Sequence, residues 1–153
     1  MIGLSTSRNT ASPAAIHAHL RECDARFTPA LSARVDLAGY ARKLATSADR
    51  FEAWYGERLV GLVAAYLSTA ATEKGFISSV SVTRDFGGKG LATALMLDCR
   101  QVARGQGLAG LTLDVSAADE VAQAFYRKLG FEVVGDLQNG FLRMEADLAV
   151  SVV

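Results

Sequence analysis

Glycines 87, 88 and 90 crowd a turn between a strand-like run that ends at Val82 and a helix-forming run from Leu91 to Ala103. Glycine has no Cβ, so the backbone N–H groups of such a turn can approach a bulky anion closely. The first N–H groups of a helix have no intrahelical acceptors, and the helix dipole is positive at that end. The segment therefore predicts a site for phosphate or pyrophosphate that is made of backbone alone.

Two familiar phosphate motifs do not fit this turn. A P-loop needs Ser or Thr directly after its lysine, whereas Lys89 is followed by Gly90. A dinucleotide fingerprint that starts at Gly88 needs a glycine at position 93, where the chain has Thr93. A structural turn stays open beside the phosphate site, and the loop alone favours neither.

A second pattern follows downstream. The run from Leu111 to Val115 alternates like a strand, and Asp119 then provides the cap of a helix that runs from Glu120 to Leu129. Gly130 ends this helix. Tyr126 lies on its apolar face, and taken by itself it is more typical of an amphipathic core residue than of a catalytic one.

Taken together, the two patterns resemble those of the GCN5-related N-acetyltransferases. The acyl-CoA motif of that family, Arg/Gln-x-x-Gly-x-Gly/Ala, matches the segment from Gly87 to Ala92. The following motif of the family matches Asp119, Ala122, Tyr126, Gly130 and Phe131. The resemblance is strong from about Phe51 to Leu148 and weak before it, and two motifs in the right order are more specific than either one.

The chain departs from the family pattern at three positions. Gly87 stands where Arg or Gln is usual, Arg84 where Pro is frequent, and Asp119 where Asn is common. The missing Arg or Gln side chain at position 87 predicts a weaker hold on the pyrophosphate. A hypothesis is that Arg84 or Lys89 partly replaces it.

The resemblance implies a direct transfer of an acetyl group from acetyl-CoA to an amine, with no metal and no covalent enzyme intermediate. The backbones of Val80 and Val82 would pair with the pantetheine arm, and an N–H near Val80 would polarise the thioester carbonyl. Tyr126 would donate a proton to the leaving thiolate. The residues assigned to the cofactor in this way are Val80, Ser81, Val82, Gly87, Gly88, Lys89, Gly90, Leu91, Ala92, Asp119, Ala122 and Phe125.

The base that removes the amine proton is not defined by the sequence. Glu73 and Asp114 are the nearest carboxylates along the chain, and serines 78, 79 and 81 occupy the strand before the glycine turn. We favour a water that one of these serines holds and that carries the proton away.

The acceptor is expected to be the primary amine of a small molecule. Residues 23–35 resemble a subgroup associated with the biosynthesis of bacterial surface polysaccharides, which suggests an amino sugar. An acyl-CoA-binding regulator without turnover is the alternative, and a domain whose glycines only turn the chain is a further one. Candidates for lining the acceptor site are Phe27, Arg34, Tyr40, Trp54 and Tyr66.

Composition excludes other classes of function. The 16 basic and 16 acidic residues cancel, which argues against nucleic acid and anionic membranes as partners. Cys23 and Cys99 are too few for a disulfide scaffold, and Cys99 is best explained as a small buried residue. His17 and His19 are expected at the surface or at a rim, with poor geometry for a metal. A cytoplasmic location is the default expectation, and a homodimer is compatible with the sequence.

The local patterns predict one domain over residues 1–148 and a loose tail over 149–153. We expect a strand at 2–5, helices at 13–23 and 36–45 around a loop at 27–32, and a hairpin of strands 51–55 and 59–67. Strands are expected at 75–82, 111–115, 131–134 and 141–147. This order predicts an α/β (α+β) fold with a central mixed sheet. The resemblance implies that the sheet is mostly antiparallel and twisted, with helices on both faces and two parallel central strands that splay apart.

Overall fold

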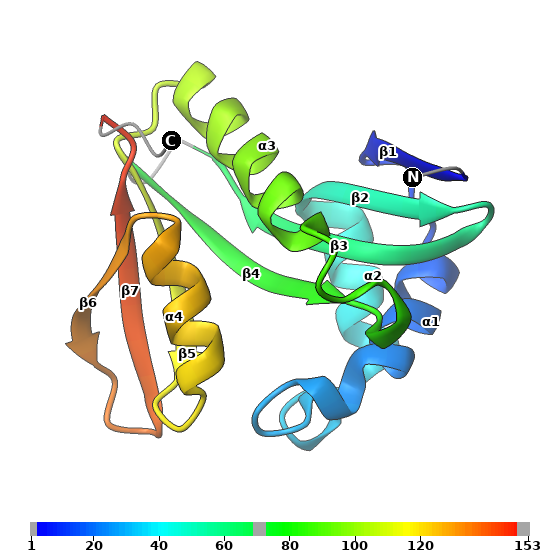
Figure 1. Cartoon of the computed structure of the whole chain (residues 1–153), viewed down its shortest axis with the longest axis horizontal. Helices are drawn as coiled ribbons and strands as arrows, with labels where there is room; N and C mark the ends of the chain where they lie inside the picture. Colours follow the sequence, from blue (N-terminus) through cyan, green and yellow to red (C-terminus); the bar gives the residue numbers. More distant parts are fainter. Residues whose placement is uncertain (1–2, 69–72, 150–153) are drawn as a thin grey trace. The chain divides into compact units, whose positions relative to one another are not determined.

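The structure is a computed structural model of the chain, and it describes residues 3–68 and 73–149. The helices and strands follow the expected order (Figure 1). They are β1 (Leu4–Arg8), α1 (Pro13–Cys23), α2 (Leu37–Ser47), β2 (Asp49–Tyr55), β3 (Arg58–Tyr66), β4 (Lys74–Val82), α3 (Leu91–Gly105), β5 (Gly110–Ser116), α4 (Glu120–Lys128), β6 (Phe131–Asp136) and β7 (Phe141–Asp147). Three short 3-10 turns, η1 (Asp24–Arg26), η2 (Leu31–Ala33) and η3 (Arg84–Phe86), complete the order.

Side-chain caps explain where three of the helices begin. Ser12 accepts a hydrogen bond from the backbone N–H of Ala15 at 3.1 Å, directly before Pro13 at the first helical position. Asp36 accepts from the N–H of Gly39 at 3.0 Å and starts α2 in the same way. Asp119 is the corresponding cap of α4. These starts confirm the positions expected from the sequence.

The described residues form a seven-stranded sheet in the order β1-β2-β3-β4-β5-β7-β6. β4 and β5 run parallel, and the pairs β1–β2, β2–β3, β5–β7 and β6–β7 are antiparallel. The parallel ladder runs from Lys74↔Gly110 to Ile77↔Leu113, although both strands continue beyond it. The mixed, mostly antiparallel sheet of the sequence prediction is thus confirmed.

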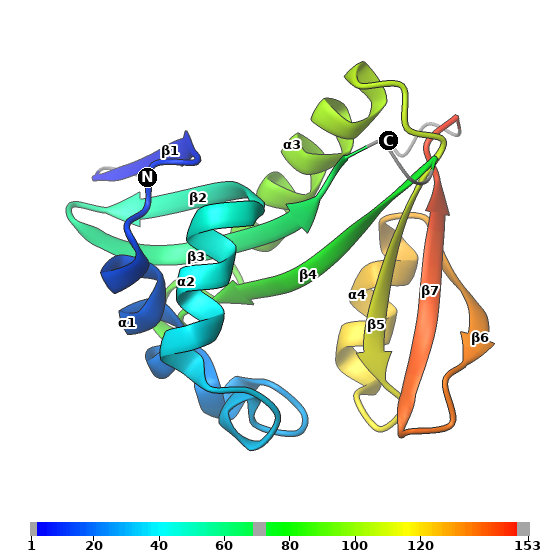
Figure 2. The same cartoon turned by 180° about the vertical axis from the view of Figure 1, so that it is seen from behind.

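The chain divides into two compact units, each made of two segments. The first unit comprises Met1–Ala65 and Ser79–Cys99. Within it, α1 and α2 lie on one side of β2 and β3, and the first part of α3 lies on the other side (Figures 1 and 2). Its core is apolar, and Leu20, Leu44 and Leu62 are among its fully buried side chains.

The second unit comprises Tyr66–Ser78 and Arg100–Val153. Here β5 pairs with β7 over its whole length, from Gly110↔Asp147 to Ser116↔Phe141. Helix α4 packs beside these strands, and Leu111, Leu113 and Met144 are almost completely buried. A single domain over 1–148 stays a prediction.

Some boundaries differ from the expectations. The first strand spans Leu4–Arg8 rather than residues 2–5, because antiparallel pairing with β2 from Leu4↔Tyr55 to Arg8↔Phe51 decides its extent. The loop expected at 27–32 contains the start of η2. Residues 150–153 of the expected tail lie outside the described residues.

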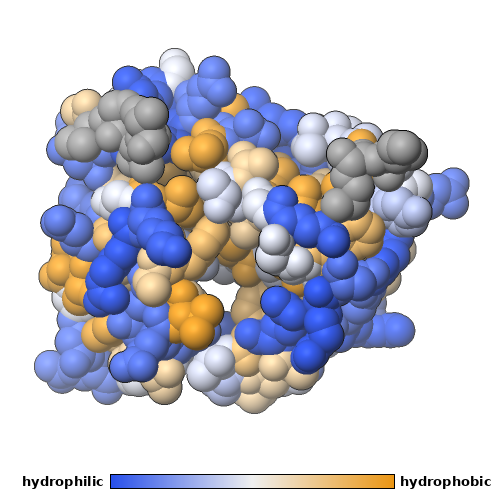
Figure 3. Space-filling view, in the orientation of Figure 1, coloured by the Kyte–Doolittle hydropathy of each residue, from blue (hydrophilic) through white to orange (hydrophobic). Residues whose placement is uncertain are grey.

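Polar side chains cover much of the surface drawn in Figure 3, with apolar side chains between them. This agrees with a chain in which 21% of the residues are charged. Within the described ranges, no helix has both the length and the apolar character needed to cross a bilayer.

Candidate active site

The glycine turn leads directly into α3. Gly88 and Gly90 adopt φ values of 72° and 80°, in the left-handed region that favours glycine. A Cβ at either position would meet no atom within 4 Å, so the space beside the turn is open. The carbonyl of Gly90 accepts from the N–H of Ala94 at 3.0 Å, so Gly90 is the N-cap of α3, and as a glycine it has no side chain to cap the helix. This geometry fits an anion held by backbone amides.

Gly87 differs from its neighbours because its backbone is extended, with φ −68° and ψ 155°. No positive φ requires glycine there. A Cβ at this position would lie 3.3 Å from the carbonyl oxygen of Arg84 and 3.7 Å from Nη2 of Arg26. Arg26 comes from η1, and no local sequence signal connects that turn with the glycine loop. Sequence reasoning therefore missed it and named Arg84 and Lys89, which are both exposed.

The segment before the glycine turn is anchored by an arginine on β3. Arg58 donates to both carboxylate oxygens of Asp85, at 2.8 Å and 3.1 Å, and also bonds to Glu22 on α1. Hydrogen bonding from Arg58 lowers the pKa of Asp85 to about 2, so this carboxylate is charged at neutral pH. The guanidinium also lies over the ring of Phe86, 6.0 Å from its centroid. These contacts fix η3, which determines where the glycine turn begins.

The end of β4 carries the residues expected to contact the pantetheine arm. Val80 and Val82 are half-buried and lie beyond the last described pair of the β4–β5 ladder. Their backbone groups on that side therefore have no β5 partner in the described ladder. On the opposite side, the chain stays bonded to β3 just beyond the end of β4, because the N–H of Thr83 donates to the carbonyl of Val60 at 2.9 Å. The expected pairing with a cofactor is compatible with this arrangement.

Tyr126 lies on α4 among aromatic side chains. Its ring centroid is 5.3 Å from that of Phe125 and 6.0 Å from that of Phe131, both in edge-to-face arrangement. Burial raises the pKa of the Tyr126 phenol, and the negative charge of Asp119 adds to the effect. The phenol is thus protonated at neutral pH and able to donate. Ala122 is half-buried on the same helix.

Asp119 has a structural contact of its own. Its Oδ1 accepts from the N–H of Ala122 at 3.0 Å, which caps α4. The cap accounts for the acidic residue at this position without a ligand. Cofactor contacts of Asp119, Ala122 and Phe125 stay predictions.

Each carboxylate considered as a base has a partner or an exposed position. Asp114 accepts from Nε and Nη2 of Arg143 at 2.7 Å and 3.0 Å, and this pair occupies both of its oxygens. Glu73 is exposed before β4. Ser79 is 5% exposed, and its hydroxyl oxygen has no hydrogen-bond partner among the described residues.

His19 was expected at the surface, and this prediction was wrong. The side chain is 1% exposed, because it shares the inner face of α1 with Ile16, Leu20 and Cys23. The spacing 16, 19, 20, 23 is the helical period that could have revealed this burial. Nδ1 of His19 lies 2.9 Å from the carbonyl oxygen of Leu59, and Nε2 lies 2.8 Å from the hydroxyl of Ser81.

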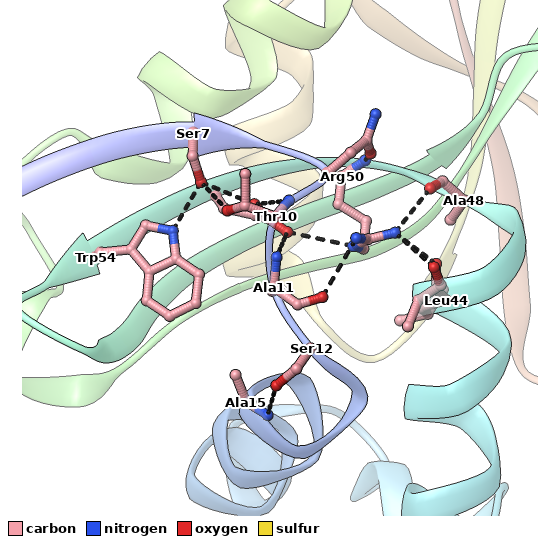
Figure 4. A network of polar contacts seen from close by, with 12 residues as sticks. Ser7, Thr10, Ala11, Ser12, Ala15, Leu44, Ala48, Arg50 and Trp54 are labelled. Carbon is pink, nitrogen blue, oxygen red and sulfur yellow. Dashed lines mark hydrogen bonds and ion pairs between the residues drawn. The ribbon is translucent and has the colours of Figure 1, made fainter.

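A buried ion pair, Glu52 with Arg50, ties the N-terminal segments of the first unit together (Figure 4). Glu52 is fully buried and accepts from the backbone N–H groups of Thr10 and Ala11 at 2.9 Å and 3.0 Å. It also accepts from the hydroxyls of Ser7 and Thr10. Sequence reasoning did not single out either charged residue, since their partners lie on other segments, namely β1, the loop after it and the end of α2.

Arg50 completes this cluster from the other side. Its guanidinium donates to the carbonyls of Leu44 and Ala48 near the end of α2 and to the carbonyl of Ala11. Trp54, a candidate for the acceptor site, donates its indole N–H to Ser7 at 2.8 Å and so adjoins the same cluster. All these groups are satisfied, and we interpret the cluster as an anchor of α1 and α2 against β2.

The remaining candidates have these environments. Phe27, Tyr40 and Tyr66 are half-buried and Arg34 is exposed, so their role at an acceptor site stays a prediction. Burial raises the pKa of the Cys99 thiol to about 12, and Cys99 is fully buried, as expected. Within the described ranges, no three His, Cys, Asp or Glu side chains form a group suited to a metal ion. A surface depression of about 390 Å³ beside Phe131 and Val133 contains no predicted site residue.

Comparisons with known proteins agree with the motifs. The model of the acetyltransferase (GNAT) family matches residues 14–131. A curated relative, N-alpha-acetyltransferase 30 of Schizosaccharomyces pombe, is 28% identical over 83 residues, which are 53% of this chain. The match spans 55% of that protein, so the chain corresponds to about half the length of the curated relative.

Solved structures share the fold at low identity. The PaiA N-acetyltransferase of Thermoplasma acidophilum, in complex with coenzyme A, aligns with a TM-score of 0.72 and 15% identity, covering 94% of this chain and 99% of that one. The ribosomal-protein-S18-alanine N-acetyltransferase of Escherichia coli aligns with a TM-score of 0.73 and 16% identity, covering 97% and 96%.

Proposed function

The chain belongs to the GNAT family of acetyltransferases, and on this premise we propose that it transfers an acetyl group from acetyl-CoA to the primary amine of a small molecule. The observation that carries the proposal is the turn with left-handed Gly88 and Gly90 at the start of α3. Open space beside both glycines and the helix dipole suit a diphosphate. The backbones of Val80 and Val82 would hold the pantetheine arm by strand-like pairing.

The transfer occurs directly in a ternary complex of enzyme, acetyl-CoA and amine. Both cysteines are buried, and burial raises the pKa of Cys23 to about 11 and that of Cys99 to about 12. Neither thiol is therefore a thiolate at neutral pH, the form that acts as nucleophile. The amine attacks the thioester carbon, the C–S bond breaks, and the protonated Tyr126 phenol donates to the leaving sulfur.

An amino sugar is the first acceptor to test, because of the resemblance of residues 23–35. The balanced charge of the chain, with 16 basic and 16 acidic residues, gives no reason to favour polycationic acceptors. Two of the similar proteins have names that refer to acetylation of N-alpha groups or of an alanine, so a short peptide with a free α-amino group belongs in the same test.

A thiol-release assay with acetyl-CoA and a panel of glucosamine, spermidine and an alanine-starting peptide tests this function. We expect release that depends on the amine and is largest with glucosamine. Thiol release with the peptide and with neither of the other amines would indicate that the acceptor is a protein N-terminus.

Calorimetry with acetyl-CoA, run in parallel, separates the enzyme from the alternatives. Binding without release across the panel would favour the acyl-CoA-binding regulator. Absence of binding at millimolar acetyl-CoA would overturn both readings. A cytoplasmic location and a homodimer stay predictions.

A further inference from the structure

Three buried polar side chains, Ser79, Ser81 and His19, lie inside the first unit, two of them on β4, the strand proposed to bind the thioester. Ser79 and Ser81 are both buried, and their side chains share one face of β4 because they are two residues apart. His19 faces Ser81 from α1. Such a set of hydrogen-bonding groups in a core needs an explanation, since apolar residues fill most of that core.

The hydrogen bonds of His19 define its tautomer. The carbonyl of Leu59 can only accept, so Nδ1 carries a proton and donates to it over 2.9 Å. In the neutral ring, Nε2 is then an acceptor, and the hydroxyl of Ser81 donates to it over 2.8 Å. The lone pair of Nε2 therefore points at a hydroxyl on β4, next to Val80 and Val82.

Burial keeps this ring neutral. Burial lowers the pKa of His19, and the positive charge of Arg58 on β3 acts in the same direction. The hydrogen bond to Leu59, the charge of Glu22 on α1 and the backbone of Ser81 on β4 raise the pKa without reversing the effect of burial. The remaining titratable neighbour is Cys23, whose Sγ lies 3.7 Å from Nε2 and whose burial raises its own pKa. His19 is thus a free base at neutral pH.

The hydroxyl of Ser79 supplies a second, independent observation. It is 5% exposed and has no hydrogen-bond partner among the described residues. A buried hydroxyl that makes no hydrogen bond is destabilising, so such groups are kept where a ligand or a water satisfies them. Its position, one residue before Val80, places it beside the proposed thioester contact.

We propose that Ser79, Ser81 and His19 form the relay that removes the proton of the acceptor amine, an inference that rests on the proposed acetyl transfer. A water held by Ser79 accepts a proton from the bound ammonium and passes one to Ser81 Oγ, while Ser81 gives its own hydroxyl proton to Nε2 of His19. The amine lone pair is then free to attack the thioester carbon.

The protons balance over the cycle. The ammonium form of the amine loses two protons as it becomes an amide. One proton passes to His19 before the attack. When the intermediate collapses, the phenol of Tyr126 donates its proton to the sulfur of coenzyme A. The second amine proton then reprotonates the Tyr126 phenol. After the products leave, His19 returns its proton through Ser81 to solvent. His19 acts through Ser81 and is a positioning and proton-holding residue rather than a group that contacts substrate.

The test compares two amines in the thiol-release assay. An alkylamine such as glucosamine is largely protonated at pH 7, whereas methoxyamine is already neutral and needs no base. His19→Gln keeps one donor and one acceptor but does not titrate. We expect it to lower kcat/KM for glucosamine by roughly 10²-fold and to leave that for methoxyamine unchanged. His17→Gln, two positions earlier on α1, is the matched control.

A pH profile gives the second readout. With wild-type protein, kcat/KM for glucosamine falls as the pH drops through the pKa of His19, and His19→Gln loses this step. Ser81→Ala and Ser79→Ala should reproduce the selective loss, which keeps the test decisive should His19→Gln fold poorly.

The other outcomes are also decisive. Equal losses with both amines would show a purely structural role, and no loss with either would also overturn the relay, while the acetyltransferase stands. Wild-type protein that binds acetyl-CoA but acetylates no amine in the enlarged panel would remove the proposed function and the relay together.

Discussion

Nη2 of Arg26 lies 3.7 Å from the place where a Cβ of Gly87 would be, so the guanidinium lies beside the glycine that stands where the family motif has Arg or Gln. Arg26 is exposed and lies in η1, between α1 and α2. The helical region of the first unit thus brings a positive charge to the turn proposed to bind the diphosphate.

Arg26→Ala should weaken the binding of acetyl-CoA by about 1 kcal/mol, roughly fivefold, because an exposed cation near a phosphate contributes about that much. The effect should shrink at high salt, where exposed charges are screened. Calorimetry at low and high ionic strength measures the loss of affinity and its dependence on salt. Arg21→Ala, an exposed arginine in the last turn of α1, is the control, and equal losses in the two variants would contradict a specific contact.

Gly90→Ala should weaken acetyl-CoA binding at least about tenfold, since alanine strains the left-handed backbone and puts a methyl group beside the amides. Gly107→Ala is a close control, because Gly107 has φ 83° and equally open surroundings at the other end of α3. Both variants should lose similar thermal stability in differential scanning calorimetry. A loss of binding that is as large in Gly107→Ala would attribute the effect to stability alone.

Tyr126→Phe should lower kcat by roughly 10²–10⁴-fold, the usual contribution of a general acid, and leave the affinity for acetyl-CoA nearly unchanged. Burial, aided by the charge of Asp119, raises the pKa of the phenol, so the proton is lost only above its ordinary range near ~10. The kcat of the wild-type enzyme should therefore show no decline up to pH 9 that is caused by deprotonation of Tyr126. Tyr55→Phe, on the exposed end of β2, is the control; normal turnover of Tyr126→Phe would exclude the phenol from the reaction.

Glu52→Gln should reduce the free energy of unfolding by about 2–4 kcal/mol at pH 7, because the new amide faces the N–H of Ala11 and the guanidinium of Arg50. Burial raises the pKa of Glu52. The hydrogen bonds from the backbone N–H groups of Thr10 and Ala11 and from the hydroxyls of Ser7 and Thr10 together lower it by more, so the pKa of Glu52 is below its ordinary value.

A carboxylate with a lowered pKa stabilises the fold above its unfolded pKa of ~4.3 and loses this contribution as pH falls through the folded value. The gap between wild type and Glu52→Gln, measured by urea unfolding, should thus be constant from pH 7 to 5 and shrink in more acidic solution. Glu57→Gln in the exposed hairpin turn should match wild type throughout. A gap that does not change with pH would contradict the assignment.

The elements and the glycine turn could be predicted because their signals are local. Ser12, Asp36 and Asp119 sit at helix starts, and each bonds to an N–H three residues along. Alternation of apolar residues marks the strands in the same way. The two motifs that resemble the family are contiguous or span a single helix, so their spacing is visible without knowledge of the fold.

The tertiary structure decided the polar partners. His19 and Ser81 are 62 positions apart, and Glu52 meets Thr10 across 42 positions, so no local pattern joins either pair. The same holds for Arg26 beside Gly87. Local sequence determines backbone shape through dihedral preference and hydrogen bonds to near neighbours, whereas the environment of a charged or titratable side chain depends on which distant segments the packed core brings against it.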